Sequence, residues 1–144
     1  MAATFESGLY AYVSAHANMA AVQALIGTRF YDRGEVPQGP TFPYVTYTRI
    51  ATNRVHSADG ESGLVQALFQ LDIWARTHKA AHELADALRL AMSGYSGAMG
   101  SFTVRGAILD DERDSPEGPI DSSETGYLSV QQDYRFWHEE GVGF

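Results

Sequence analysis

The chain has 144 residues, of which 44% are apolar and 19% charged, and this corresponds to one globular domain. Ten Lys and Arg against 18 Asp and Glu give a formal net charge of −8, so the basic face of a nucleic-acid-binding protein is not expected. The absence of cysteine excludes a disulfide framework, a cysteine-ligated zinc site and a thiol nucleophile. No stretch approaches the roughly 20 apolar residues that span a bilayer, and no basic region followed by an apolar run opens the chain, so we expect a soluble protein without a signal peptide.

The first quarter of the chain is predicted to be helical. Apolar residues recur at helical spacing over 4–16, a break is expected near Asn18, and a second short helix runs to Ile26. Gly27 is placed to end it. Residues 28–31 are predicted to form a short strand, and the proline- and glycine-containing segment 32–43 a loop.

Two strands and a helix follow. Residues 44–50 are rich in β-branched and aromatic side chains, which predicts a strand, and the pattern extends as far as Val55. The turn chemistry of 58–63 predicts a hairpin. From Val65 to Ile73, apolar residues alternate with polar ones, as in a sheet covered on one face. Thr77 is predicted to cap a helix that runs to Ser93 and lies on the apolar face.

Leu68 and Trp74 are the exceptions to this alternation, because they fall among polar residues on the face predicted to be wet. Either a neighbouring loop covers them or they form a subunit contact, where aromatic residues are enriched. The sequence favours neither interpretation over the other.

The last third predicts a second pair of strands. Residues 94–100 are a small-residue connection, and a strand covers 102–109. Residues 110–126 are predicted to be a long acidic loop, since Pro116, Gly118 and Pro119 oppose regular structure. A final strand covers 127–137, and residues 139–144 are predicted to be a loose tail. We therefore expect a single domain over 1–144 of the α+β class, with a mainly antiparallel sheet of about four strands and helices packed on one face.

Sites for chemistry are weakly indicated. His78 and His82 lie four apart on the predicted helix, but no third metal ligand is indicated, so no metal site is predicted. The acidic loop lacks the ligand spacing of an EF-hand, and no nucleophile elbow or phosphate-binding glycine motif occurs. We predict no catalytic residues and no cofactor, and therefore a protein that is not an enzyme.

Five segments together carry a family resemblance: Val22–Tyr31, Pro43–Tyr47, Val65–Ala75, Ala80–Arg89 and Tyr134–Trp137. They are spread from the early helix to the last strand, so the resemblance extends over nearly the whole chain. With these segments the chain resembles the tail completion, or tail terminator, family of tailed bacteriophages and phage-like particles.

The resemblance implies structural work in the virion. Members of this family form a ring, usually of six subunits, on the head-proximal end of the tail tube. The ring ends tail elongation and forms the docking face for the head connector. The implied partners are therefore further copies of the chain, the tail tube protein and the head–tail connector or stopper, while DNA passes through the lumen without specific binding. Assembly is expected in the bacterial host cytoplasm, with no membrane partner.

Candidate subunit or partner contacts are polar residues of the predicted loops, together with Leu68 and Trp74 on the sheet face predicted to be wet. They are Arg54, His56, Asp59, Glu61, Leu68, Trp74, Asp110, Asp111, Glu112, Asp114 and Glu117. If acidic groups line the channel, DNA passes without sticking. Two alternatives stay open: another neck or tail protein, such as a head–tail stopper or a tube subunit, and a small ligand-binding α+β domain.

Overall fold

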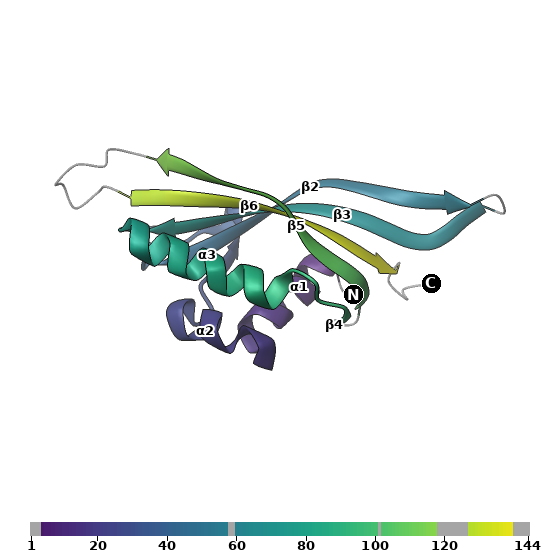
Figure 1. Ribbon diagram of the computed structural model, residues 1–144, viewed down its shortest axis with the longest axis horizontal. Helices are drawn as coiled ribbons and strands as arrows, with labels where there is room; N and C mark the ends of the chain where they lie inside the picture. Colours follow the sequence, from purple (N-terminus) through teal and green to yellow (C-terminus); the bar gives the residue numbers. More distant parts are fainter. Residues whose placement is uncertain (1–3, 58–59, 101, 118–126, 140–144) are drawn as a thin grey trace.

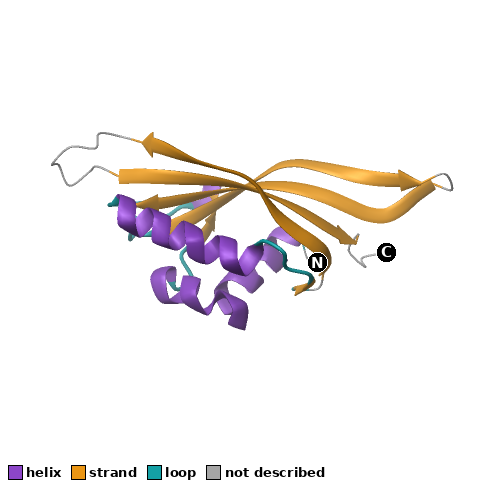
Figure 2. Ribbon diagram, in the orientation of Figure 1, coloured by secondary structure: helices purple, strands orange, loops and turns teal. Residues whose placement is uncertain are grey.

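Three α-helices and six strands make up the part of the chain that the computed structural model describes, which is residues 4–57, 60–100, 102–117 and 127–139. The helices lie on one side of a single sheet, and the other side carries no α-helix (Figures 1 and 2). The helices are α1 (Phe5–Ala15), α2 (Ala20–Ile26) and α3 (His78–Met92). The strands are β1 (Phe30–Asp32), β2 (Tyr44–Ser57), β3 (Gly60–Ala75), β4 (Gly97–Met99), β5 (Phe102–Glu117) and β6 (Tyr127–Glu139).

The helices begin and end close to where the sequence predicts. The Thr4 hydroxyl accepts a hydrogen bond from the Ser7 amide at 3.2 Å and caps α1. The break is a 3-10 turn at Ala17–Met19, and α2 ends at Ile26, directly before Gly27, whose φ of 60° favours glycine. Thr77 caps α3 through the Ala80 amide at 3.1 Å. The three predicted helices are confirmed.

The prediction of about four strands is wrong, because the sheet has six strands in the order β1-β2-β3-β6-β5-β4. It is also mixed, since β1 pairs with β2 in parallel and the other pairs are antiparallel. The four long strands correspond to the predicted ones. The segment expected to be a connection contains β4, which has only three residues and pairs with the start of β5. So short a strand depends on its partner and has no periodic signal of its own.

The predicted acidic loop at 110–126 is also wrong in its first half. Residues 110–117 continue β5 and pair with β6 as far as Glu117 opposite Tyr127. Pro116 lies opposite Leu128 on a part of β5 that has no described strand on its outer side, and such edge positions are where proline occurs within sheets. The second half of the predicted loop, 118–126, lies outside the described residues. The β2–β3 hairpin is likewise longer than predicted, since pairing reaches Ser57 and Gly60.

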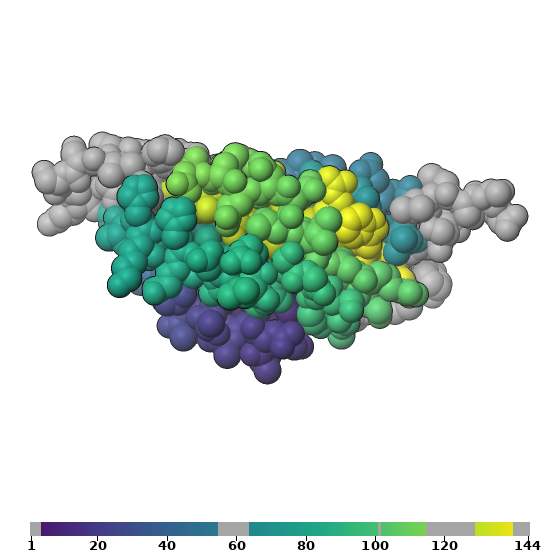
Figure 3. Space-filling model, viewed as in Figure 1, coloured from purple at the N-terminus to yellow at the C-terminus, as the bar shows by residue number. Residues whose placement is uncertain are grey.

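The core lies between the sheet and the helices. Phe69 of β3 is fully buried, with its ring centroid 5.7 Å from that of Phe5 on α1 and 5.9 Å from that of Phe136 on β6. In the space-filling view, α3 packs closely on β5, with α2 beside it (Figure 3). The predicted apolar face of α3 is confirmed, and its buried residues are Ala81, Leu84, Ala85, Leu88 and Met92.

A series of hydrogen bonds between polar groups crosses this core. The buried Gln132 amide donates to the Ala85 carbonyl at 2.9 Å and to the Glu112 carboxylate at 2.6 Å. Its oxygen accepts from the Tyr134 hydroxyl at 2.8 Å. Burial raises the pKa of Tyr134 well above its usual range, so the phenol stays a donor. These bonds fix the position of α3 along the sheet, because a buried polar group left unpaired costs about 1–3 kcal/mol.

Alkaline unfolding is expected to report the burial of Tyr47. Burial first, and then the nearby carboxylates beginning with Asp32, raise the pKa of Tyr47 to about 12, whereas an unfolded tyrosine has a pKa near 10. A raised folded pKa stabilises the fold fully below pH ~10, and this contribution is lost as pH rises toward 12. The loss amounts to about 2–3 kcal/mol by that linkage. Urea unfolding from pH 8 to 12 should therefore show Tyr47→Phe losing less stability than the wild-type protein, and parallel curves would contradict the assignment.

Candidate functional site

The predicted contact residues lie at the two ends of the sheet and on its helix-free face. The C-terminal end of β2 and the C-terminal end of β5 are at opposite ends of the elongated molecule (Figure 1). The candidates therefore do not form one site. They fall into three groups, which are described in turn.

The first group lies on the β2–β3 hairpin. Arg54 is exposed near its end, and His56 pairs with Glu61 across the two strands. The structure describes only the backbone of His56 and Glu61, and Asp59 lies outside the described residues.

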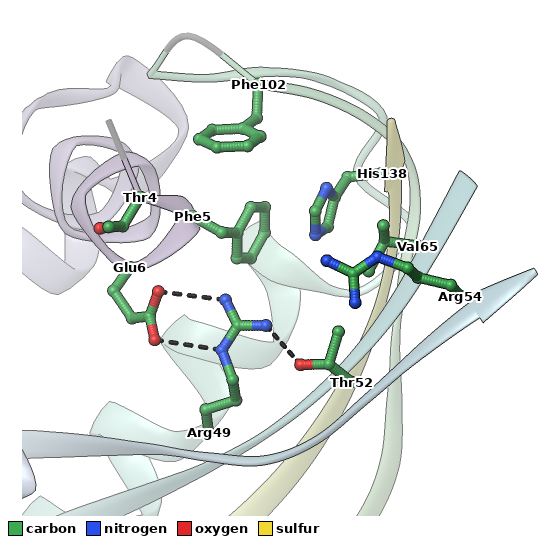
Figure 4. A pocket seen from close by; sticks show the side chains of 9 residues that line it. All are labelled: Thr4, Phe5, Glu6, Arg49, Thr52, Arg54, Val65, Phe102 and His138. Carbon is green, nitrogen blue, oxygen red and sulfur yellow. Dashed lines mark hydrogen bonds and ion pairs between the residues drawn. The ribbon is translucent and has the colours of Figure 1, made fainter. Parts of the chain in front are cut away.

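Arg54 opens onto a pocket of about 360 Å³ beside α1 (Figure 4). Five elements (α1, β2, β3, β5 and β6) and the residue before α1 contribute its walls, so no sequence motif marks it. The lining residues are Thr4, Phe5, Glu6, Arg49, Thr52, Arg54, Val65, Phe102 and His138. Phe5 and His138 stack with their ring centroids 4.3 Å apart and nearly parallel.

An ion pair between α1 and β2 dominates the polar part of this pocket. Arg49 donates from Nε and Nη2 to the two oxygens of Glu6, at 3.1 and 3.0 Å. These hydrogen bonds lower the pKa of Glu6 in spite of its partial burial. The Thr52 hydroxyl accepts from Arg49 at 2.5 Å. That hydroxyl therefore contacts a guanidinium rather than a base.

The second group is Leu68 and Trp74 on the helix-free face of β3. Both side chains are half-buried. Trp74 stacks on Tyr44 with ring centroids 6.1 Å apart, and its indole donates to Thr46 at 3.0 Å. Leu68 lies between Ala51 and Arg135 in the register. Both residues thus remain candidate contacts.

The third group is the acidic row on β5, which strand alternation divides between the two faces of the sheet. Asp111 faces the helix-free side and pairs with Arg113 at 2.7 Å, and Asp110 pairs with Arg135 at 2.8 Å. Glu112 and Asp114 face the helices, where Glu112 accepts from Gln132 at 2.6 Å and Asp114 lies 3.5 Å from His82. Glu117 ends β5, and only its backbone is described.

The helix-free face carries a row of arginine–aspartate pairs that sequence reasoning missed. Arg33 contacts the buried Asp72 at 2.5 Å, and the Gln70 amide donates to Asp72 at 3.1 Å. Arg113 then reaches Asp133 at 3.1 Å as well as Asp111. The alternation of polar residues on β3 and β6 indicated such a face, but the pairing of each charge depends on the register of β6 against β5.

The described residues contain no group of three or more His, Cys, Asp or Glu placed to hold a metal ion. His78 and His82 stack with ring centroids 6.1 Å apart. Within the same part of the chain, no helix has the length and apolar character needed to cross a membrane.

Comparisons with known proteins agree with this fold. Residues 11–139 match the family model described as tail completion protein gp17. A chain of a solved structure entitled "Virion of native gene transfer agent (GTA) particle" is similar in fold, with a TM-score of 0.67 and 19% sequence identity over 89% of this chain and 90% of that one. No curated protein sequence is significantly similar. Because the family model matches well over half of the residues, the chain belongs to the tail completion protein gp17 family.

Proposed function

We propose that the protein is a non-enzymatic structural subunit of a phage or phage-like tail. It forms a ring, of six copies, on the head-proximal end of the tail tube, ends tail elongation and offers the docking face for the head connector. The observation that carries this proposal is the match of residues 11–139 to the tail completion family. The similarity of the fold to a chain of a gene transfer agent virion supports it.

The edges of the sheet suit a ring of identical copies. Within the described chain, β1 covers β2 at 45–47, and β4 covers β5 at 102–104, so long outer edges of β2 and β5 have no strand beside them. Successive antiparallel pairing from β2 through β3 and β6 makes β2 and β5 run in opposite directions. The β2 edge of one copy can therefore approach the β5 edge of the next in antiparallel orientation. Such head-to-tail contacts close into a ring when the rotation between copies fits.

The charge of the chain suits a channel for DNA. A formal net charge of −8 per subunit repels a polyanion, so DNA is expected to pass through the ring without being held. Partners in this role are further copies of the chain, the tail tube protein and the connector or stopper. The protein resides in the tail or neck of the particle, after assembly in the bacterial cytoplasm.

Deleting the gene from its parent particle locus tests the proposal. We expect overlong tails of irregular length that lack heads in electron micrographs, because nothing stops tube growth. A plasmid copy of the wild-type gene should restore the normal length.

Other phenotypes would contradict the terminator role. Tails of normal length that fail to join heads, or heads that leak DNA, would indicate a connector or stopper. Unchanged infectious particles would exclude the structural role and favour a ligand-binding domain with the pocket beside Arg54 as its site.

A further inference from the structure

We propose that Asp110, Asp111 and Asp133 mask arginines on the helix-free face of the sheet and so keep this face from binding the phosphate backbone of DNA. The inference rests on the proposed passage of DNA through a ring of this protein. The net charge of the chain accounts only in general for the weak attraction to DNA, whereas this proposal assigns it to named residues. Without these carboxylates, the same face would bind the phosphate backbone.

The arginines concerned come from three different parts of the chain. Arg113 lies on β5, Arg135 on β6, and Arg33 follows β1 at the border of the sheet. Arg113 is opposite Gln131 in the β5–β6 register, and Arg135 is opposite both Ile108 and Leu68. A guanidinium group can bind two oxygens of a phosphate in the same bidentate way in which it binds a carboxylate. Three of them on one face make a site for a nucleic-acid backbone.

Each of these arginines is held by an aspartate. Arg113 donates to Asp111 at 2.7 Å and to Asp133 at 3.1 Å, and these contacts, with Asp133 foremost, raise the pKa of its guanidinium. Arg135 donates to Asp110 at 2.8 Å. Arg33 is held by Asp72, which is 1% exposed in its side chain and belongs to the packed interior of the sheet. The three exchangeable masks are therefore the aspartates that contact Arg113 and Arg135.

Asp133 points to a role other than stability. Its Oδ1 is buried and has no hydrogen-bond partner among the described residues, although its Oδ2 contacts Arg113. A buried carboxylate oxygen without a donor destabilises a fold, and an asparagine there would lose no hydrogen bond at that atom. The negative charge of Asp133 is explained by its ion pair with Arg113, which neutralises a guanidinium on the exposed face of the sheet.

The test compares the wild-type protein with two variants that lose the same number of negative charges. The face variant is Asp110→Asn, Asp111→Asn and Asp133→Asn. The charge-matched control is Glu35→Gln, Glu83→Gln and Asp86→Asn, whose positions are exposed and lie outside the strands of the sheet. Affinity for a fluorescent 30-base-pair duplex is measured by anisotropy from low to physiological salt, and the fold is checked by circular dichroism.

We expect the face variant to bind the duplex at least about tenfold more tightly than the control at low salt. Its affinity should fall with salt at a slope of about −2 in a log–log plot, as for the two phosphate contacts that Arg113 and Arg135 can make. Equal affinities for the two variants, or wild-type binding as tight as that of the face variant, would overturn the proposal. Self-association of the face variant without DNA binding would also overturn it, by assigning the pairs to a subunit contact.

A single substitution covers the case in which the triple variant does not fold. Asp110 is 39% exposed in its side chain and is the aspartate that pairs with Arg135, so Asp110→Asn should leave the fold intact and still give a measurable gain in DNA binding over Glu83→Gln. No gain would again overturn the proposal. These results are independent of tail length in the deletion strain, so failure of the masking proposal and failure of the terminator role can be told apart.

Discussion

Phe69→Ala is expected to lower the free energy of unfolding by about 3–5 kcal/mol, the usual loss for removing a fully buried phenylalanine. Phe69 has no exposed surface and lies where the N-terminal helix meets the middle of the sheet. Its ring centroid is within 6.5 Å of those of Phe5, Tyr47 and Phe136. The Arg49 guanidinium lies 5.0 Å from the ring centre. Truncation thus leaves a cavity that four elements border, and urea denaturation measures the loss.

The matched control for this cavity is Leu90→Ala. Leu90 lies on α3, is 73% exposed and is not part of the core. Its truncation should therefore change the free energy of unfolding by no more than about 0.5 kcal/mol. Similar losses for the two variants would mean that Phe69 does not occupy the centre of the core.

Gly8→Ala is expected to destabilise the protein by about 1–3 kcal/mol, although alanine is the better helix former. A Cβ at position 8 of α1 would lie 2.4 Å from the carbonyl oxygen of Met99, which belongs to the backbone of β4. Backbone cannot rotate away as a side chain can, so α1 or β4 must shift. Thermal and urea unfolding of the variant measure the cost.

Gly106→Ala is the control for the glycine substitution. A Cβ at Gly106 would meet no atom within 4 Å, so we expect a change within about 0.5 kcal/mol of zero. If Gly8→Ala proved as stable as Gly106→Ala, the close approach of α1 to β4 would be contradicted.

The sequence by itself determined the helices and strands in which apolar residues recur at regular spacing and form one buried face. The capped helix α3 and the alternating strand β3 carry their signals locally, because each repeats an apolar side chain at the period of its own backbone. The same signals placed the helices on one side of the sheet and indicated the family. They also placed Leu68 and Trp74 on the helix-free face, where the structure has them.

Only the tertiary structure decided the remaining elements and the contacts between charges. Strand β4 has three residues and exists because β5 pairs with it, whereas β1 at Phe30–Asp32 overlaps the short strand that the sequence predicts at 28–31. The acidic half of β5 is a strand despite Pro116, because β6 supplies its hydrogen bonds and Arg113 compensates its charge. The pocket beside Arg54 and the arginine–aspartate row join residues far apart in the chain. Both the pocket and this row depend on how strands that are distant in the sequence pair with one another. The local pattern of a single strand does not specify the register of that pairing.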